Sequence, residues 1–269
     1  WWNIWENDYR RKETTVRPAL RLTAQLTPWM KWVTEGSYNY YYVRGEGKYP
    51  GSGYANKGGS YKLSLSNKEQ INANTNLMFD HQINEDFRVN GFVRYEMYHD
   101  YNMALEANTK GDLIMPNQFF LGNGSDGYDA RQTMSGTKTI QSVAAQVGFS
   151  WRDQVYVDVT ARNDWSSSLV YADGHGNYSF FYPSINASWL IHETLRGKLP
   201  KWITFAKVRA SYAQVGNDTQ AFYINSAYEL SSYNGANGGY YALSVPNKVY
   251  SQNLRPEKKA SWEIGLDWR

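Results

Sequence analysis

The last eleven residues, Lys259-Ala-Ser-Trp-Glu-Ile-Gly-Leu-Asp-Trp-Arg269, alternate strictly between apolar side chains and polar side chains or glycine. Because successive side chains on a β-strand point to opposite faces of the sheet, this segment predicts a strand with two different faces. The apolar face would carry Ala260, Trp262, Ile264, Leu266 and Trp268. The polar face would carry Lys259, Ser261, Glu263, Gly265, Asp267 and Arg269. We therefore expect this strand to separate an apolar environment from a polar one.

The same alternation recurs along most of the chain. It predicts strands near residues 20–26, 30–43, 71–80, 87–97, 142–151, 155–162, 184–192 and 206–212. Short connections alternate with long ones, and the long ones are expected at about residues 44–69, 99–138, 163–177 and 214–258. Strands of about ten residues joined in this way are typical of transmembrane β-barrels with short periplasmic turns and long extracellular loops. The predicted fold is an all-β, antiparallel up-and-down barrel in a membrane.

The aromatic residues support this interpretation. The 269 residues include 11 tryptophans and 23 tyrosines, although the mean hydropathy is only −0.66. Tryptophans at the ends next to short turns predict an aromatic belt at one membrane surface, and they are Trp29, Trp151, Trp202 and Trp268. A second belt is expected from Tyr40, Tyr42, Tyr178, Phe180 and Tyr212. A soluble β-sandwich, the alternative, explains neither the one-sided tryptophans nor the alternating loop lengths.

Composition and motifs argue against several other classes of protein. No segment approaches the roughly 18 apolar residues of a membrane-spanning helix. The formal charge of +3 predicts no nucleic-acid partner, and the absence of cysteine rules out disulfides and thiolate metal sites. The four histidines have no metal-ligand spacing, and no nucleophile–base or phosphate-loop motif occurs. We therefore expect neither an enzyme nor a cofactor or metal site.

The number of strands predicts an incomplete barrel. About nine strands are expected, or ten if residues 1–9 belong to one. Bacterial single-chain barrels have even strand counts, and an open sheet edge is not tolerated in lipid because its backbone groups lack partners. The first residues show neither an initiator methionine nor a signal peptide. The sequence is thus expected to be part of a longer chain, pairing with strands outside it.

Four ordered motifs resemble the SusC/RagA family of TonB-dependent outer-membrane transporters of Bacteroidota. They are Val155–Ser168, Phe181–Ile185, Trp202–Asp218, and Asn253–Lys258 leading into Ser261–Asp267. The match covers residues 153–269 well, whereas residues 1–150 resemble the family in strand pattern alone. The resemblance implies a 22-stranded barrel in the outer membrane, filled by a plug domain, covered by a SusD-like surface lipoprotein and energised by TonB. This sequence lacks the plug, the TonB-contacting segment and the final strands.

On the same grounds, the expected function is import of oligosaccharides, with peptide import as the alternative within the family. A passive pore or structural barrel is the alternative from another class. Membrane lipid is an expected partner of any such barrel.

Two groups of side chains are candidates for a functional site. Charged residues expected on the polar face, facing the lumen or contacting the plug, are Glu96, Asp158, Arg162, Lys207, Arg209, Glu263 and Asp267. The alternative for these is ordinary solvation and cross-strand pairing. Aromatic residues expected to contact cargo or the lid are Trp165, Tyr233, Tyr240 and Tyr241. Residues 163–167 are also typical of a turn, because Asn, Asp and Ser bond to nearby backbone groups.

Overall fold

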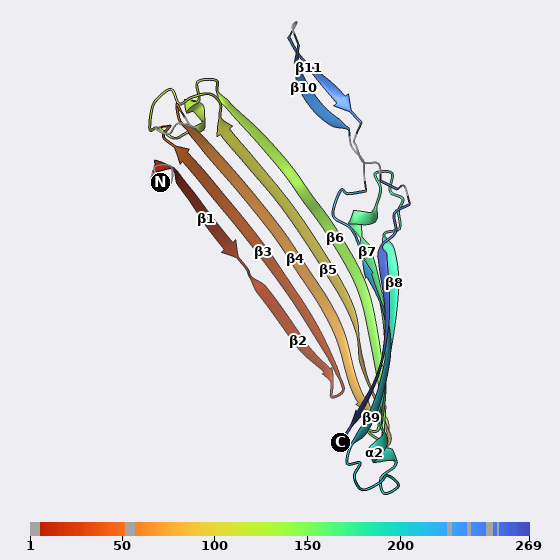
Figure 1. The fold of residues 1–269 in the computed structure, drawn as a ribbon. Helices are drawn as coiled ribbons and strands as arrows, with labels where there is room; N and C mark the ends of the chain where they lie inside the picture. The colour runs from red at the N-terminus through yellow and green to blue at the C-terminus, as the bar shows by residue number, and fades with distance from the viewer. Residues whose placement is uncertain (1–5, 52–56, 225–227, 236–237, 246–249, 252) are drawn as a thin grey trace. The chain divides into compact units, whose positions relative to one another are not determined.

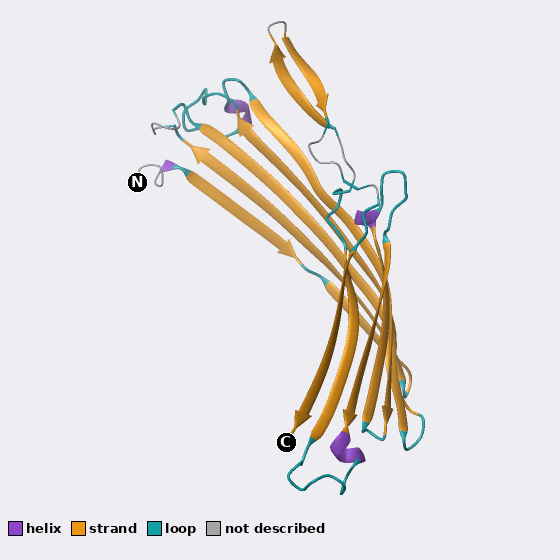
Figure 2. Ribbon diagram, turned by 45° about the vertical axis from the view of Figure 1, so that its right-hand side comes forward, coloured by secondary structure: helices purple, strands orange, loops and turns teal. Residues whose placement is uncertain are grey.

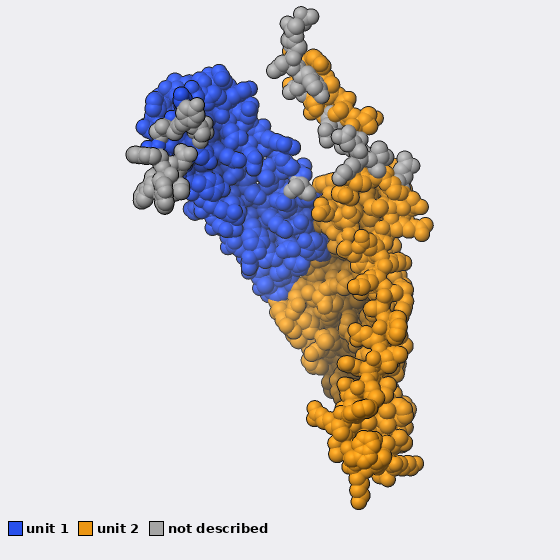
Figure 3. Space-filling view, viewed as in Figure 1, with its two compact units in different colours: residues 1–20, 36–72, 98–137 blue, residues 21–35, 73–97, 138–269 orange. Residues whose placement is uncertain are grey.

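The computed structural model describes residues 6–51, 57–224, 228–235, 238–245, 250–251 and 253–269 (Figure 1). The chain divides into two compact units, which Figure 3 colours separately. Unit 1 comprises residues 1–20, 36–72 and 98–137. Unit 2 comprises residues 21–35, 73–97 and 138–269. Unit 2 contains every predicted polar-face residue and all four aromatic candidates.

Nearly all of the described secondary structure is β-strand (Figure 2). The strands are β1 (Asp8–Val16), β2 (Ala19–Thr27), β3 (Met30–Tyr49), β4 (Ser60–Gln82), β5 (Phe87–Thr109), β6 (Tyr128–Trp151), β7 (Val155–Ser166), β8 (Ser179–Leu190), β9 (Ala206–Asn217), β10 (Glu229–Gly235), β11 (Gly238–Ser244) and β12 (Glu257–Trp268). Short helical turns occur at η1 (Leu121–Asn123), η2 (Ser167–Leu169) and α2 (Ile191–Thr194).

Ten strands form one sheet, in the order β1-β3-β4-β5-β6-β7-β8-β9-β12, with β2 pairing to β3 beside this path. Arg17 and Pro18 separate β1 from β2, because proline has no N–H to donate to the ladder. The predicted all-β, antiparallel partial barrel of nine to ten strands is confirmed. The additional strand is Asp8–Val16, so it shares only Asp8 and Tyr9 with the expected residues 1–9, and residues 1–5 lie outside the described part of the chain.

Two of the predicted long connections are wrong in extent. β3 continues to Tyr49 and β4 begins at Ser60, so most of residues 44–69 is strand. In the same way β5 continues to Thr109 and β6 begins at Tyr128, which shortens the predicted loop 99–138. Where both faces of a strand are polar, the apolar–polar alternation that marks a strand disappears although the backbone ladder continues. The predicted loops 163–177 and 214–258 are close to the observed ones, but the second contains the unpredicted hairpin β10–β11.

The strand register of unit 2 separates two faces. Cross-strand partners share a face, so one row joins Val147, Val159, Ile185, Tyr212 and Trp262 from β6 to β12. The neighbouring row, one residue away, joins Gln146, Thr160, Ser184, Ala213 and Ser261 on the opposite face. The faces predicted for residues 259–269 are therefore confirmed and extend across five strands.

The apolar face has the height of a membrane. On β7, aromatic residues mark both edges of this face. Val155 at one end pairs with Trp151 and Trp189, and Trp165 lies at the other end. These edges are ten residues apart, or about 33 Å along a strand, which a barrel tilt of about 40° reduces to about 25 Å. The apolar band of outer-membrane barrels is about 25 Å tall. Large apolar side chains of this face are also exposed, including Trp262 at 74%.

One member of the predicted second aromatic belt does not lie on this face. Phe180 is buried and is the register partner of Asp164 on the polar face. Tyr212 lies on the apolar face, but in the same row as Val159, well inside the band. The alternation at residues 178–181 is interrupted by consecutive aromatic residues, so the sequence pattern does not fix which of them faces lipid.

Unit 1 contains the long-loop ends of β3 to β6. Its loop between β5 and β6 is organised by Asn123, a buried side chain whose amide bonds to the backbone of Met115 and Gln118 at 2.6–2.9 Å. The amide of Leu113 bonds to Gly58 O of the neighbouring loop at 2.8 Å. These bonds satisfy backbone groups that have no ladder partner, so the loop has a defined structure.

Candidate functional site on the polar face

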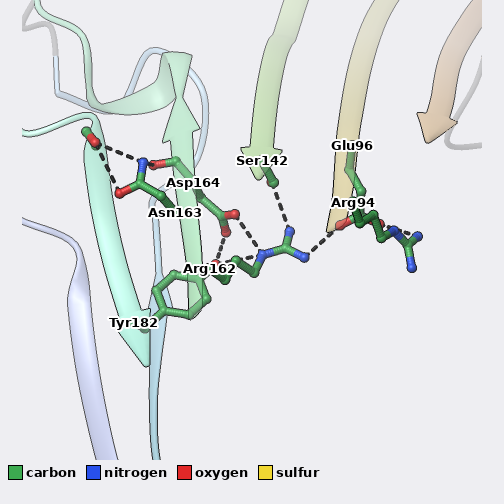
Figure 4. A network of polar contacts seen from close by, with 8 residues as sticks. Arg94, Glu96, Ser142, Arg162, Asn163, Asp164 and Tyr182 are labelled. Atoms are coloured by element: carbon green, nitrogen blue, oxygen red, sulfur yellow. Dashed lines mark hydrogen bonds and ion pairs between the residues drawn. The ribbon is translucent and has the colours of Figure 1, made fainter. Parts of the chain in front are cut away.

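A charged network on the polar face centres on Arg162 of β7 (Figure 4). Its Nη1 donates to Glu96 Oε2 of β5 at 2.6 Å, and its Nε donates to Asp164 Oδ1 at 2.7 Å. Its Nη2 donates to Ser142 Oγ of β6 at 2.9 Å. The Tyr182 hydroxyl of β8 donates to the other oxygen of Asp164. One guanidinium therefore joins four adjacent strands.

The network is compensated in charge. Arg94 also pairs with Glu96, so two guanidiniums face two carboxylates. The side chain of Arg162 is 32% exposed and that of Asp164 only 11%, which partly removes both from water. Half-buried charges are stable when they are paired and hydrogen-bonded on most of their atoms. Such a surface can hold polar side chains or cargo, while it holds the four strands in register.

The other predicted charged residues also lie on the polar face. Asp158 is in register with Gly148, where an added Cβ would be 2.6 Å from Asp158 Oδ1, so glycine leaves room for this carboxylate. Arg209 lies over Gly265 in the same way. The remaining three are placed by register, with Lys207 opposite Asp267 and Glu263 opposite Ser211. The structure brings Arg162 and Glu96 together, while it leaves the others spread along the face.

A second polar cluster, which the sequence pattern did not predict, lies at the long-loop ends of β6, β7 and β9. Lys138 Nζ donates to Asp218 Oδ1 at 2.7 Å. The hydroxyls of Ser166 and Ser168 both donate to the other oxygen of Asp218, from Ser168 at 3.0 Å. Burial raises the pKa of Asp218, but the bonds from Lys138 and Ser166 outweigh it, so the pKa is lowered from its ordinary 3.8. Asp218 is therefore a partly buried anion at the base of the longest loop.

This cluster corrects the prediction that residues 163–167 form a turn. β7 continues to Ser166, and both Asp164 and Ser166 are buried side chains of the polar face. The signal was present, because Arg162, Asp164, Ser166 and Ser168 continue the two-residue period of the polar face beyond the last apolar residue. Asp218 had no such signal, because its partners are about 50 and 80 residues away.

Side-chain hydrogen bonds join the loop after β7 to the excursion between β9 and β12. The Tyr171 hydroxyl donates to Ser251 O at 2.6 Å and accepts from the amide of Leu254 at 3.0 Å. Asn177 Nδ2 donates to Asn253 Oδ1 at 2.7 Å. The loop after β7 thus contacts both ends of the excursion between β9 and β12. The hydrogen bonds that join these loops explain the polar residue types of the loop after β7.

We expect Asp218→Asn to weaken the contact between these loops. The substitution leaves the partly buried Lys138 without its anion, at a cost of about 2 kcal/mol, which corresponds to roughly thirty-fold faster local opening. Hydrogen exchange of peptides covering residues 166–170 in the full-length protein would measure it. Asp173→Asn is the matched control, because Asp173 lies in the loop that contains the measured residues but is exposed and does not contact Asp218. Equal exchange in both variants would contradict the role of Asp218.

The same contact predicts a pH dependence. Because the folded pKa of Asp218 is lowered, its contribution to stability is fully present above the unfolded pKa of about 3.9 and is lost as the pH falls through the lower folded value. Protection of residues 166–170 should therefore be constant between pH 5 and 7 and decline only below pH 4, after correction for intrinsic exchange. A decline centred near pH 6 would point to a histidine instead.

The predicted aromatic contacts are distributed over two places. Trp165 is in register with Gln141 and Ser179 on the apolar face, opposite the charged network, and this placement gives no support to a contact with cargo in a lumen. Tyr233 and Tyr240 are register partners in the hairpin β10–β11. Tyr240 is 58% exposed and Tyr241 is 76% exposed. The side chain of Tyr233 lies outside the described residues.

The described residues contain no group of three or more His, Cys, Asp or Glu side chains arranged to hold a metal ion. None of the helices within the described ranges is long and apolar enough to cross a membrane.

Comparison with known proteins places this fold in a family. Residues 2–269 match the family model described as TonB dependent receptor-like, beta-barrel. The chain therefore belongs to this family of outer-membrane transporter barrels, which confirms the family predicted from the four motifs. TonB-dependent receptor P26 of Formosa agariphila is 23% identical over 226 residues, which are 80% of this chain and 21% of that protein.

Solved structures agree on the fold. The RagAB peptide transporter has a TM-score of 0.83 at 14% identity, over 97% of this chain and 28% of that one. The siderophore receptor PiuA of Acinetobacter baumannii has a TM-score of 0.52 at 12% identity, over 96% of this chain and 38% of that one. The chain thus spans about a fifth of the length of the curated relative and 28% of the matched RagAB chain.

Proposed function

We propose that this chain is the central part of the barrel of a TonB-dependent importer that takes up oligosaccharides together with a SusD-like surface lipoprotein. The observation that carries the proposal is the pair of opposite faces in unit 2. One is apolar, exposed and about as tall as a membrane, and the other is polar with its half-buried charges compensated. The polar face then lines a lumen, which a plug domain outside this sequence would fill and TonB would act upon.

The orientation and the cargo class belong to the same proposal. The long connections would be extracellular and the short ones periplasmic, in the outer membrane of a Gram-negative bacterium of the Bacteroidota. The exposed rings of Tyr240 and Tyr241 in the longest loop suit stacking on sugar rings or contact with the lipoprotein lid. The charges on the polar face would then position the plug and the passing cargo.

Peptide import is the second candidate. The observation in its favour is the fold similarity to RagAB, which is described as a peptide transporter. A passive pore is the third, and it would neither need TonB nor carry a lipoprotein.

The test is to purify the full-length protein in mild detergent, identify what co-purifies, and titrate it with panels of oligosaccharides and peptides by calorimetry. The proposal predicts a lipoprotein partner and binding of at least one oligosaccharide class. Binding of peptides without any glycan would replace the cargo class by the second candidate. Uptake that continues in cells without TonB would contradict the importer.

A further inference from the structure

A groove of about 570 Å³ lies on the apolar face of unit 2, close to the ends from which the long loops leave. Its floor follows β6 through Thr139, Gln141 and Val143. Tyr95 lines it from β5 and Trp165 from β7, on either side of this floor. The residues that complete the lining are Ser166, Ser167, Val170 and Tyr178.

The dimensions of the groove suit a single chain-like ligand. β5 and β7 are both neighbours of β6, so their backbones are two strand spacings apart, or about 9.5 Å. The aromatic side chains of Tyr95 and Trp165 stand on these two strands and flank a channel that runs along β6. Beyond Val143, the residues of β6 on the same face are apolar, namely Ala145, Val147 and Phe149. A ligand in the channel would thus lie along the wall of the barrel, as an acyl chain does.

The chemistry of the lining changes along the floor. Val143 lies on the side of the membrane centre, and Gln141 and Thr139 follow towards the long loops, where the Ser167 hydroxyl accepts a hydrogen bond from the Thr139 amide. Among the described residues that line the groove, none is charged. A phosphate headgroup is usually held by arginine or lysine, whereas aromatic rings with neutral hydroxyls and amides suit a sugar.

We propose that this groove binds one outer-leaflet lipid, an acylated sugar, with an acyl chain over Val143 and its sugar against Gln141 and Thr139. The face on which the groove lies is the lipid-contacting face of an outer-membrane barrel, so the ligand reaches it from the surrounding membrane. Trp165 is the residue between Asp164 of the charged network and Ser166 of the Asp218 cluster. A bound lipid therefore covers the outside of the rim where the two polar clusters meet.

Native mass spectrometry of the full-length protein released from outer membranes in mild detergent tests this proposal. The wild-type protein should retain one acylated sugar per barrel. Val143→Trp fills the floor of the groove and should lower that occupancy at least tenfold. Val159→Trp is the matched control, because Val159 has a similar exposure on the same face, 44% against 41% for Val143, but lies outside the groove. It should keep the lipid.

A heat-dependent shift in electrophoretic mobility should be the same for both variants, which separates loss of lipid from loss of folding. A wild-type protein that retains no lipid would overturn the proposal, as would equal occupancy in Val143→Trp and Val159→Trp. Retention of a phospholipid that Val143→Trp displaces would also overturn it, because the groove would then bind the wrong headgroup class. None of these outcomes depends on the cargo or on TonB.

Discussion

Val159→Arg is expected to lower the free energy of unfolding by about 2–4 kcal/mol, the cost of an arginine at the midplane of a membrane barrel. Val159 lies in the middle of β7 on the apolar face, in register with Val147 and Ile185, and is 44% exposed. On a water-exposed sheet the same substitution would change stability by no more than about 0.5 kcal/mol. The difference arises because lipid, unlike water, does not solvate a guanidinium. Urea titration of the full-length barrel in phospholipid vesicles measures it.

Two further variants on β7 serve as controls. Thr160→Arg places the same charge one residue along but on the polar face, and should cost less than about 1 kcal/mol because the lumen face is hydrated. Val155→Arg lies on the apolar face beside the short turns, where the cost falls to about 0–1 kcal/mol. Equal stabilities of the Val159 and Thr160 variants would mean that neither face of unit 2 meets lipid.

Arg162→Met is expected to have the second-largest effect, a loss of about 2 kcal/mol in the free energy of unfolding. Removing one partner of a fully buried ion pair costs about 3–5 kcal/mol, and the 32% exposure of the Arg162 side chain reduces this by solvent screening. The loss arises because Glu96 and Asp164 remain in the partly buried network with less positive charge. Arg209→Met is the matched control on the same face, because it leaves this network intact, and it should change stability by less than about 1 kcal/mol.

A double substitution tests whether the effect comes from the network. Adding Glu96→Gln to Arg162→Met removes one of the two carboxylates that lost their contact with Arg162, so the two losses should be less than additive by about 1 kcal/mol. Strict additivity would mean that Arg162 stabilises the sheet through packing of its aliphatic stem alone.

The faces of the sheet could be predicted from the sequence, whereas the polar clusters could not. Within the membrane band, lipid on one side and water on the other impose alternation, and one row such as Val159, Ile185 and Trp262 follows from it directly. Beyond the band both faces are polar, so the extensions of β3 to β6 looked like loops. Asp218 and Lys138 are 80 residues apart in the sequence, so their pairing depends on how distant strands align, and no local pattern contains that information.

Trp165 illustrates the same limit within a single motif. Its residue type suits a binding site, and the neighbouring Asn, Asp and Ser residues are typical of a turn. The face on which it lies depends on whether β7 ends before or after it. Because β7 continues to Ser166, Trp165 lies an even number of residues from Val159 on the same strand, and therefore on the same apolar face.

If unit 2 is part of an outer-membrane barrel, one of its faces contacts lipid and the other lines an aqueous lumen. Spin labels placed one at a time at residues 155–166 of β7, in the full-length protein reconstituted in vesicles, test it most directly. We expect odd-numbered positions to be accessible to dissolved oxygen and even-numbered positions to a water-soluble paramagnetic reagent, with oxygen accessibility greatest near Val159. Equal access of the water-soluble reagent to Val159 and Thr160 would contradict it.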